Sequence, residues 1–248
     1  MFGIRSYKRP KSADKITDNF YHIHEMPNLD CNIYLLVGKN GENSEIALID
    51  AGNALNSHNL VDGISNLGLD PKKITKLIIT HEHLDHILGI YNLPEIINPD
   101  VEIIALGETA RTIREGDEET IAPRQLGIKA SRFGANIRPL SVTEVKTDDT
   151  IEFGDFRFKV YFTPGHSRGS MSLYDPSKKI LFPGDVVFCG GSFGRVDFPG
   201  GSGSKLKESI NKLADLDITY LCPGHMRMSK NGSAEIKKSK RMINSYFR

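Results

Sequence analysis

The sequence is poor in cysteine and has no long apolar run. Its three cysteines, Cys31, Cys189 and Cys222, are odd in number and far apart, which favours a reduced intracellular chain over a disulfide framework. No apolar stretch approaches the length of a membrane-spanning helix, and the basic segment 1–15 lacks the apolar core of a signal peptide. We therefore expect a soluble cytoplasmic protein without structural disulfides.

A surplus of charge of either sign is also missing. The 32 Lys and Arg residues almost balance the 31 Asp and Glu residues, so the formal net charge is +1. Without a global field, the composition does not favour nucleic acid, a membrane surface or a polyanion as partner. The chain shows no internal repeat and no linker, and its length is typical of one large domain. We expect a single domain over residues 1–248.

The apolar patterns predict an α/β protein. Helices are expected at 55–68, 205–216 and 234–248 because apolar residues recur there at helical spacing. Strands are expected at 16–24, 31–38, 45–50, 73–80, 101–106, 150–153, 156–162, 170–174, 178–183 and 218–222. Each half of the chain runs from strands to helices. This order predicts two mixed β-sheets packed face to face with helices on the outer faces, a four-layer αββα sandwich.

Residues that can bind metal stand where predicted strands end. In KLIITHEHLDHILG, residues 76–89, three histidines and two carboxylates follow an apolar run directly. Four other strand ends carry Asp50, His166, Asp185 and His225, and a Pro-Gly pair precedes each of the last three. Such a pair turns the chain sharply and lets the backbone pass close to an ion. A solvated loop is the alternative for any one of these segments, but the repeated design favours one shared site.

The donor set favours two transition-metal ions. Imidazole and carboxylate ligands favour zinc, iron or manganese over calcium or magnesium, and no cysteine occupies a donor position. Seven donors exceed the needs of one ion, whereas two ions bridged by a carboxylate use them all. Paired ions about 3.5–4 Å apart polarise a substrate and generate hydroxide near neutral pH. The donors are His81, His83, Asp85, His86, His166, Asp185 and His225.

The segment His81–His86 resembles the His-x-His-x-Asp-His motif of the metallo-β-lactamase fold superfamily, and the later donors follow in the family's order. The resemblance covers roughly residues 16–226. It implies that His81, His83 and His166 bind the first metal. Asp85, His86 and His225 would bind the second metal, and Asp185 would bridge both. It also implies that Asp50 orients the histidine loop through hydrogen bonds.

Departures from the family narrow the resemblance. Asp185 weighs against true β-lactamases, which generally lack a bridging Asp, and His83 weighs against flavodiiron proteins, which carry Glu there. Residues 181–202 are similar to small glyoxalase II-like hydrolases and to persulfide dioxygenases. The long C-terminal helical domain of typical glyoxalase II and its Lys/Tyr signature are not evident, which weighs against glutathione thioesters.

The resemblance implies a dinuclear metal hydrolase with zinc as the preferred metal and iron or manganese as alternatives. A bridging hydroxide would attack an acyl carbonyl, and Asp85 would orient the nucleophile or accept its proton. The substrate would be a hydroxyacyl-thiol thioester, with a lactone or another ester next. An iron-dependent persulfide dioxygenase using His81, His166 and Asp185 is the main rival. A phosphodiesterase and a non-catalytic metal-binding protein are the others.

The surrounding residues support less specific expectations. Residues 107–138 are polar and helical in part, and we expect a helical lid or the contact surface of a homodimer. Arg195 either holds a substrate carboxylate or pairs with Asp197. Glu82 is expected to be solvated or to support the ligands through hydrogen bonds. His22 and His24 are expected on an exposed strand face.

Overall fold

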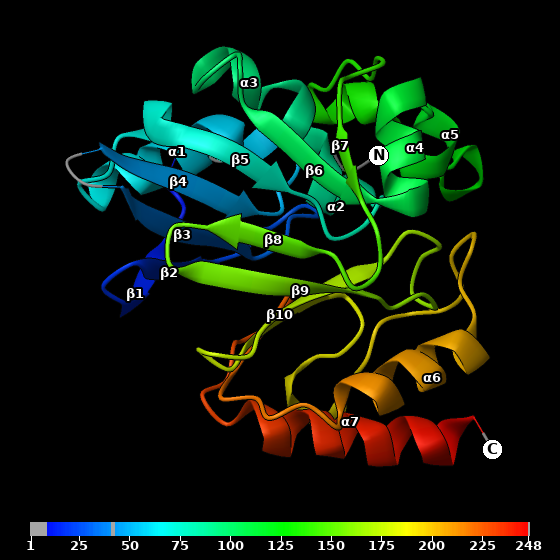
Figure 1. Ribbon diagram of the computed structural model, residues 1–248. Coiled ribbons are helices and arrows are strands. Elements are labelled where there is room, and N and C mark those ends of the chain that lie inside the picture. The colour runs from blue at the N-terminus through cyan, green and yellow to red at the C-terminus, as the bar shows by residue number, and fades with distance from the viewer. Residues whose placement is uncertain (1–8, 41–42, 248) are drawn as a thin grey trace.

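The structure is a computed structural model that describes residues 9–40 and 43–247. Two β-sheets pack face to face, and helices cover both outer faces (Figure 1), as the sequence predicts. The first sheet contains, in spatial order, β1 (Ala13–Thr17), β2 (Phe20–Ile23), β3 (Ile33–Asn40), β4 (Asn43–Ile49), β5 (Ile74–Ile78), β6 (Glu102–Leu106) and β7 (Thr143–Val145). The second contains β12 (Tyr220–Pro223), β11 (Ile180–Gly184), β10 (Met171–Asp175), β9 (Phe156–Phe162) and β8 (Thr150–Phe153).

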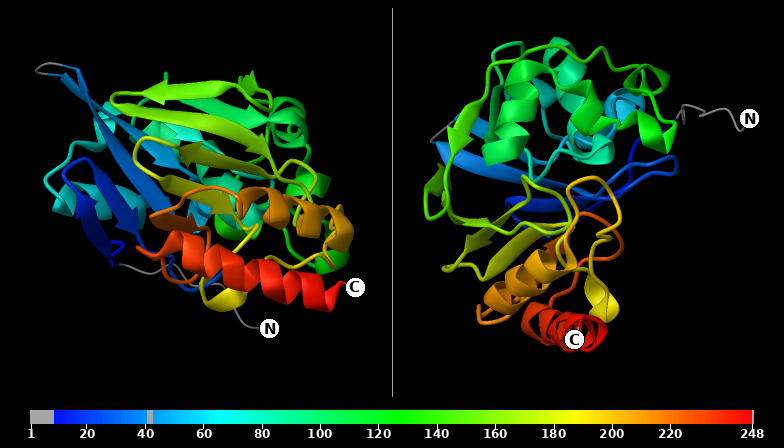
Figure 2. Two further views of the ribbon diagram at one scale, coloured as in Figure 1. Left: turned by 60° about the horizontal axis from the view of Figure 1, so that its bottom comes forward. Right: turned by 90° about the vertical axis from the view of Figure 1, so that its right-hand side faces the viewer.

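The helices divide between the two outer layers. Figure 2 shows α6 and α7 side by side against the second sheet, on the opposite side of the molecule from the other helices. The helices over the first sheet are α1 (Ser57–Asn66), α2 (Leu84–Ile87), α3 (Leu93–Ile96), α4 (Gly107–Glu115) and α5 (Glu118–Ile121). Those over the second sheet are α6 (Gly203–Leu213) and α7 (Gly232–Tyr246). None of the described helices is both long enough and apolar enough to cross a bilayer.

Three apolar layers hold these elements together. Along β3, Leu35 belongs to the apolar layer between the first sheet and its helices, whereas Tyr34 and Leu36 pack between the two sheets. In β11, Phe182 joins the layer between the sheets and Leu181 joins the layer under α6 and α7. Successive strand residues point to opposite faces, so a strand covered on both faces needs a continuous apolar run. Each fully buried Leu or Phe contributes about 1.5–3 kcal/mol to folding.

The strand directions bring the predicted donors to one edge of the sandwich. β4 and β5 are parallel, β11 and β12 are parallel, and β9 runs in the direction of β11 because both are antiparallel to β10. The carboxyl ends of these strands therefore meet at one edge, which is where open α/β sheets form their sites. Across the sheets, the Tyr34 hydroxyl donates to the Pro223 carbonyl at 2.9 Å and positions the loop that carries His225.

Three details of the secondary structure differ from the sequence-based expectation. The single strand predicted at 16–24 is wrong, because a turn at 18–19 divides it into β1 and β2, which pair with each other. The short edge strand β7 was not predicted. The sequence ILGIYNL, residues 87–93, predicts a helix that begins after the histidine motif, whereas α2 begins at Leu84, inside the motif. The sequence KNGENS, residues 39–44, predicts a polar turn between the strands expected at 31–38 and 45–50, and its residues 41 and 42 lie outside the described part of the chain.

Candidate metal centre

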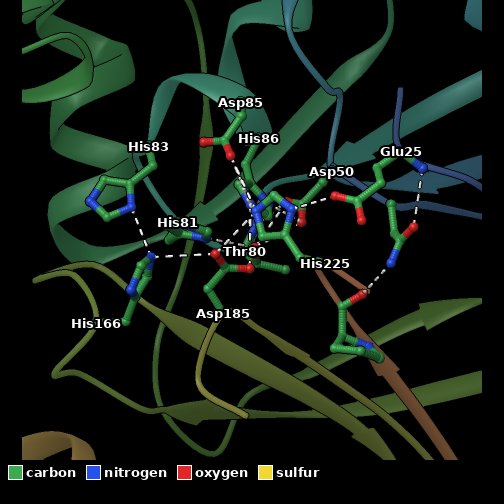
Figure 3. A network of polar contacts seen from close by, with 12 residues as sticks. Glu25, Asp50, Thr80, His81, His83, Asp85, His86, His166, Asp185 and His225 are labelled. Carbon is green, nitrogen blue, oxygen red and sulfur yellow. Dashed lines mark hydrogen bonds and ion pairs between the residues drawn. The ribbon is translucent and has the colours of Figure 1, made fainter. Parts of the chain in front are cut away.

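The seven predicted donors converge at this edge (Figure 3). His81 and His83 follow β5, Asp85 and His86 lie in α2, and His166, Asp185 and His225 follow β9, β11 and β12. Ligand atoms lie within 4.8 Å of one another in each of three sets: His81, His83 and His166; Asp85, His86 and His225; and His81, His86 and Asp185.

Asp185 lies between the first two sets. One carboxylate oxygen, Oδ1, is 3.4 Å from His86 Nε2. The other, Oδ2, is 3.5 Å from His166 Nε2 and 3.3 Å from His225 Nε2. This carboxylate therefore reaches histidines of both sets, as a bridging ligand must. Its metal-binding role and those of the six other donors remain predictions.

Hydrogen bonds fix the outer nitrogen of four imidazoles and leave Nε2 facing the centre. His86 Nδ1 lies 2.8 Å from Asp50 Oδ2, and His225 Nδ1 lies 2.7 Å from Glu25 Oε2. His166 Nδ1 donates to the Arg195 carbonyl at 2.8 Å. Carboxylates and carbonyls only accept, so Nδ1 of these three histidines carries a hydrogen and Nε2 is the nitrogen that faces the centre, which is the usual arrangement of a metal-binding histidine. There His166 Nε2 lies 2.8 Å from His83 Nδ1. His81 Nδ1 lies 3.1 Å from the Thr80 hydroxyl.

Asp50 connects the histidine loop to β4. Its carboxylate accepts hydrogen bonds from the Thr80 backbone N–H at 2.8 Å and from the Thr80 hydroxyl, as well as from His86. Asp50 has φ +65°, a left-handed conformation that aspartate tolerates better than most residues. The strained backbone at this strand end directs its carboxylate toward the loop.

The centre favours positive charge. Burial alone lowers the pKa of His225, but the carboxylates of Asp185, Asp85 and Glu25 outweigh burial and raise that pKa far above its ordinary value. Burial, followed by the neighbouring His166, lowers the pKa of His83 to about 3. The His83 imidazole is thus neutral and available as a ligand. The buried carboxylates are stabilised by positive charge nearby.

Two further observations fit metal ions at this place. Among the described side chains, His81 Nε2 and Asp185 Oδ1 are buried without a hydrogen-bond partner, a costly condition that a metal bond would relieve. Gly224 passes so close that a Cβ atom there would lie 2.2 Å from Asp185 Oδ1 and 2.5 Å from His86 Cε1. The backbone therefore leaves space beside the donors that any larger residue would fill. The donor set suits zinc, iron or manganese.

The model of the metallo-beta-lactamase superfamily matches residues 26–225, which includes every one of these donors. The chain belongs to this superfamily. Its members are generally hydrolases that bind divalent metals. The match confirms the family and the fold expected from the His81–His86 motif.

Curated relatives in the superfamily are about one-third identical to this chain. A probable metallo-hydrolase of Methanocaldococcus jannaschii is 31% identical over 199 residues, which cover 78% of this chain and 86% of that protein. An uncharacterized protein of Aquifex aeolicus is 33% identical over 156 residues, covering 62% of this chain and 68% of that protein. The acyl-coenzyme A thioesterase MBLAC2 of Bos taurus is 31% identical over 157 residues, covering 60% of this chain. That match spans only 54% of the bovine protein.

Solved structures of the superfamily share the fold. The BLEG-1 B3 metallo-beta-lactamase superposes with a TM-score of 0.68 at 26% identity, covering 86% of this chain and 95% of that chain. The protein TTHA1623, described in a di-iron-bound form, superposes with a TM-score of 0.66 at 28% identity and covers 84% of this chain and 94% of that chain. One similar chain of the superfamily is thus described with bound iron, and the metal of this chain stays a prediction.

Glu25 belongs to the candidate metal centre, but the sequence patterns did not indicate it. It contacts His225 as described above and also accepts a hydrogen bond from the Met226 backbone N–H at 3.1 Å. Glu25 precedes β3 and lies 200 residues from His225 in the chain. No local pattern links residues so far apart. Only its place directly after the His22–His24 strand pattern could have drawn attention to it.

Glu82 holds two ligand loops together. Only 3% of the residue is exposed, so the expectation of a solvated side chain is wrong and the alternative of hydrogen-bonded support is correct. Its carboxylate accepts from the backbone N–H groups of Arg168 at 3.0 Å and Gly169 at 3.2 Å. It also accepts from the hydroxyls of Ser167 and Thr109, both at 2.9 Å. The loop after His166 and helix α4 are therefore tied to the histidine motif.

We expect Glu82→Ala to lower the free energy of unfolding by about 3 kcal/mol, because buried donors lose their acceptor. Because the loop after His166 loses its anchor, metal affinity should fall by about 10–100-fold. Glu82→Gln should recover part of both losses, since its amide oxygen can still accept. Urea unfolding and metal titration measure these effects. Glu95→Ala, which truncates a 78% exposed side chain, is the control, and equal behaviour of the Glu82 and Glu95 variants would contradict the assignment.

Arg195 pairs with Asp197 and borders the site. Two hydrogen bonds of 2.9 and 2.6 Å join the guanidinium to the Asp197 carboxylate, and its carbon lies 4.4 Å from the centre of the Phe198 ring. Of the two alternatives expected for Arg195, the pairing with Asp197 is the one that the structure shows. A role of Arg195 in substrate binding stays a prediction.

The other residues singled out from the sequence are His22, His24 and the three cysteines, of which Cys31 lies beside His86 and Asp50. His22 is 2% exposed, so the expected exposed strand face is wrong at this position. His24 does have an acidic neighbour, Asp14, whose Oδ2 lies 2.9 Å from its Nε2. All three cysteines are free and buried, which confirms the absence of disulfides.

Proposed function

We propose that this protein is a dinuclear metal-dependent hydrolase that cleaves thioester or ester bonds. The observation that carries the proposal is the common orientation of His81, His86, His166 and His225. Each has its outer nitrogen near a hydrogen-bonding partner and directs Nε2 toward the space around Asp185. A site that only stabilised the fold would not need this many buried, correctly oriented ligands.

The first ion would be held by His81, His83 and His166, and the second by Asp85, His86 and His225, with Asp185 shared. Two bound divalent ions supply a charge that polarises an acyl carbonyl and lower the pKa of water so that hydroxide forms near neutral pH. The remaining chemistry belongs to the chain's own side chains.

Asp85 is the residue proposed to orient the attacking water or to accept its proton. Burial raises the pKa of its carboxyl, but His86 and His225 outweigh burial and hold the pKa below its ordinary value. Asp85 is therefore ionised at neutral pH and can accept a hydrogen bond from an attacking water and orient it. Its side chain is 18% exposed and borders the cavity beside the donors, so it can reach a substrate.

A covalent intermediate is not part of the proposal. The described residues that line the cavity include no serine and no cysteine, and the hydroxyl of Thr120 donates to Asp117 at 2.8 Å. Direct attack by water on the carbonyl is the mechanism that these side chains support. The thioester class is further supported by the relative named as an acyl-coenzyme A thioesterase and by the similarity of residues 181–202 to glyoxalase II-like hydrolases.

The test is metal quantification on the purified protein together with assays of a hydroxyacyl thioester, an acyl thioester, a lactone, a phosphodiester and a persulfide. We expect two metals per chain and turnover of a thioester or ester that exceeds turnover of the other classes. Oxygen consumption with the persulfide, together with one iron per chain, would instead establish the dioxygenase. A metal-loaded protein inactive on the whole panel would indicate a non-catalytic metal-binding protein.

A further inference from the structure

A cavity of ≈ 610 Å³ opens directly beside the donors, within the size range of small-molecule sites. Five donors border it, namely His83, Asp85, His166, Asp185 and His225. Nine apolar residues form most of the remaining wall, namely Leu29, Leu84, Ile121, Pro123, Leu126, Ile128, Phe188, Phe198 and Pro199. A substrate group that enters this cavity would therefore contact a mostly apolar surface.

Two segments supply most of this wall. Residues 118–128, within the expected lid, contribute Ile121 and Leu126 among others, and the loop 188–199 contributes Phe188 and Phe198. Leu126 is 38% exposed and Leu29 is 51% exposed. Large apolar side chains left exposed around a cavity indicate a surface that an apolar ligand covers.

The apolar wall of the cavity provides few hydrogen-bonding or ion-pairing partners for a polar substituent of the substrate. Among the described residues that line the cavity, Arg195 is the sole lysine or arginine, and its guanidinium is already paired with Asp197. The hydroxyl of Thr120 is committed to Asp117. A hydroxyl or carboxylate placed against this wall would lose its water without gaining a partner, which is unfavourable.

We infer that this cavity binds an unsubstituted, medium-length acyl chain, so that the substrates are thioesters or esters of fatty acids rather than of short hydroxy acids. The inference rests on the proposed function. Residues 118–128 form the wall that contacts the chain, which assigns part of the expected lid a role in chain selectivity. Each methylene group that leaves water contributes about 0.8 kcal/mol, or about fourfold in kcat/KM when the contact is made in the transition state.

The test compares thioesters of one thiol with acetyl, butyryl, 3-hydroxybutyryl and hexanoyl groups. We expect kcat/KM to rise by about 200-fold from acetyl to hexanoyl, which differ by four methylene groups, and butyryl to exceed 3-hydroxybutyryl. Leu126→Asp should lower the hexanoyl-to-acetyl ratio at least about tenfold, because the charge opposes burial of the chain. Ser131→Asp is the matched control. It adds the same charge at an exposed position of residues 107–138 that lies outside this cavity, and the hexanoyl-to-acetyl ratio should stay at its wild-type value.

Calorimetry on the metal-loaded protein measures the binding of hexanoate and of acetate, and this readout does not depend on turnover. Hexanoate should bind more tightly and with a more negative heat-capacity change, and Leu126→Asp should remove the difference. Equal kcat/KM for all chain lengths, or preference for the hydroxyacyl group, would overturn the inference while the proposed hydrolase stands. Tighter binding of hexanoate without hydrolysis of any thioester or ester would support the cavity's role and overturn the hydrolase instead.

Discussion

Asp185→Ala should lose most of the catalytic activity and at least one of the two metal ions. Asp185 reaches His86, His166 and His225 with its two oxygens, so no other donor can replace it in both sets. Losing a shared ligand removes several kcal/mol of transition-state stabilisation, and about 4 kcal/mol corresponds to about a thousandfold in kcat/KM. Metal analysis and steady-state kinetics on the same preparation measure both losses.

Two further variants make this result interpretable. Asp185→Asn keeps the size of the side chain but removes its charge, and it should lose activity almost as strongly because a neutral amide is a weak bridge. Asp155→Ala removes an exposed aspartate from the β8–β9 turn and should keep both metals and full activity. An Asp185→Ala protein with two metals and wild-type kcat/KM would overturn the bridging assignment.

Removal of metal with a chelator should abolish activity and lower the melting temperature. Ions that bind only the folded chain stabilise it by about 2.7 kcal/mol per site at a hundredfold excess over Kd, so two sites supply about 5 kcal/mol. In a protein of this size that loss lowers Tm by about 10–20 °C. Thermal unfolding with and without chelator measures the effect. The melting temperature should fall rather than rise, because the buried carboxylates repel one another once the cations between them are removed.

Reconstitution then identifies the metal. Zinc, iron and manganese are added back separately to the stripped protein, and the ion that restores both Tm and kcat is the functional one. Asp185→Ala serves as the control, since its Tm should respond to added metal less than that of the wild type. Unchanged Tm and activity after complete metal removal would contradict a metal-dependent enzyme.

Several strands of the fold could be predicted because they depend on local patterns of apolar and polar residues. The continuous apolar runs of β3, β4 and β11 predict strands covered on both faces, and the structure confirms them. The turn at 18–19 escaped notice because a two-residue turn preserves the alternation of polar and apolar residues on either side. The three residues of β7 are too few and too polar to show any period. His22 was misplaced because all of β2 is buried, so alternation does not reveal an exposed face there.

The sequence by itself determined the chemical character of the centre. Donor types, their position at strand ends and the spacing within His81–His86 are local properties, and they predicted the family and the candidate ligands. Apart from Asp50, the groups that orient those ligands were decided by tertiary structure alone, as with Glu25 on His225 and Glu82 on the loop after His166. Tertiary structure also decided the apolar cavity, whose walls come mostly from two segments far apart in the chain. A sequence pattern records which face of an element is apolar, whereas these contacts depend on how separate elements pack.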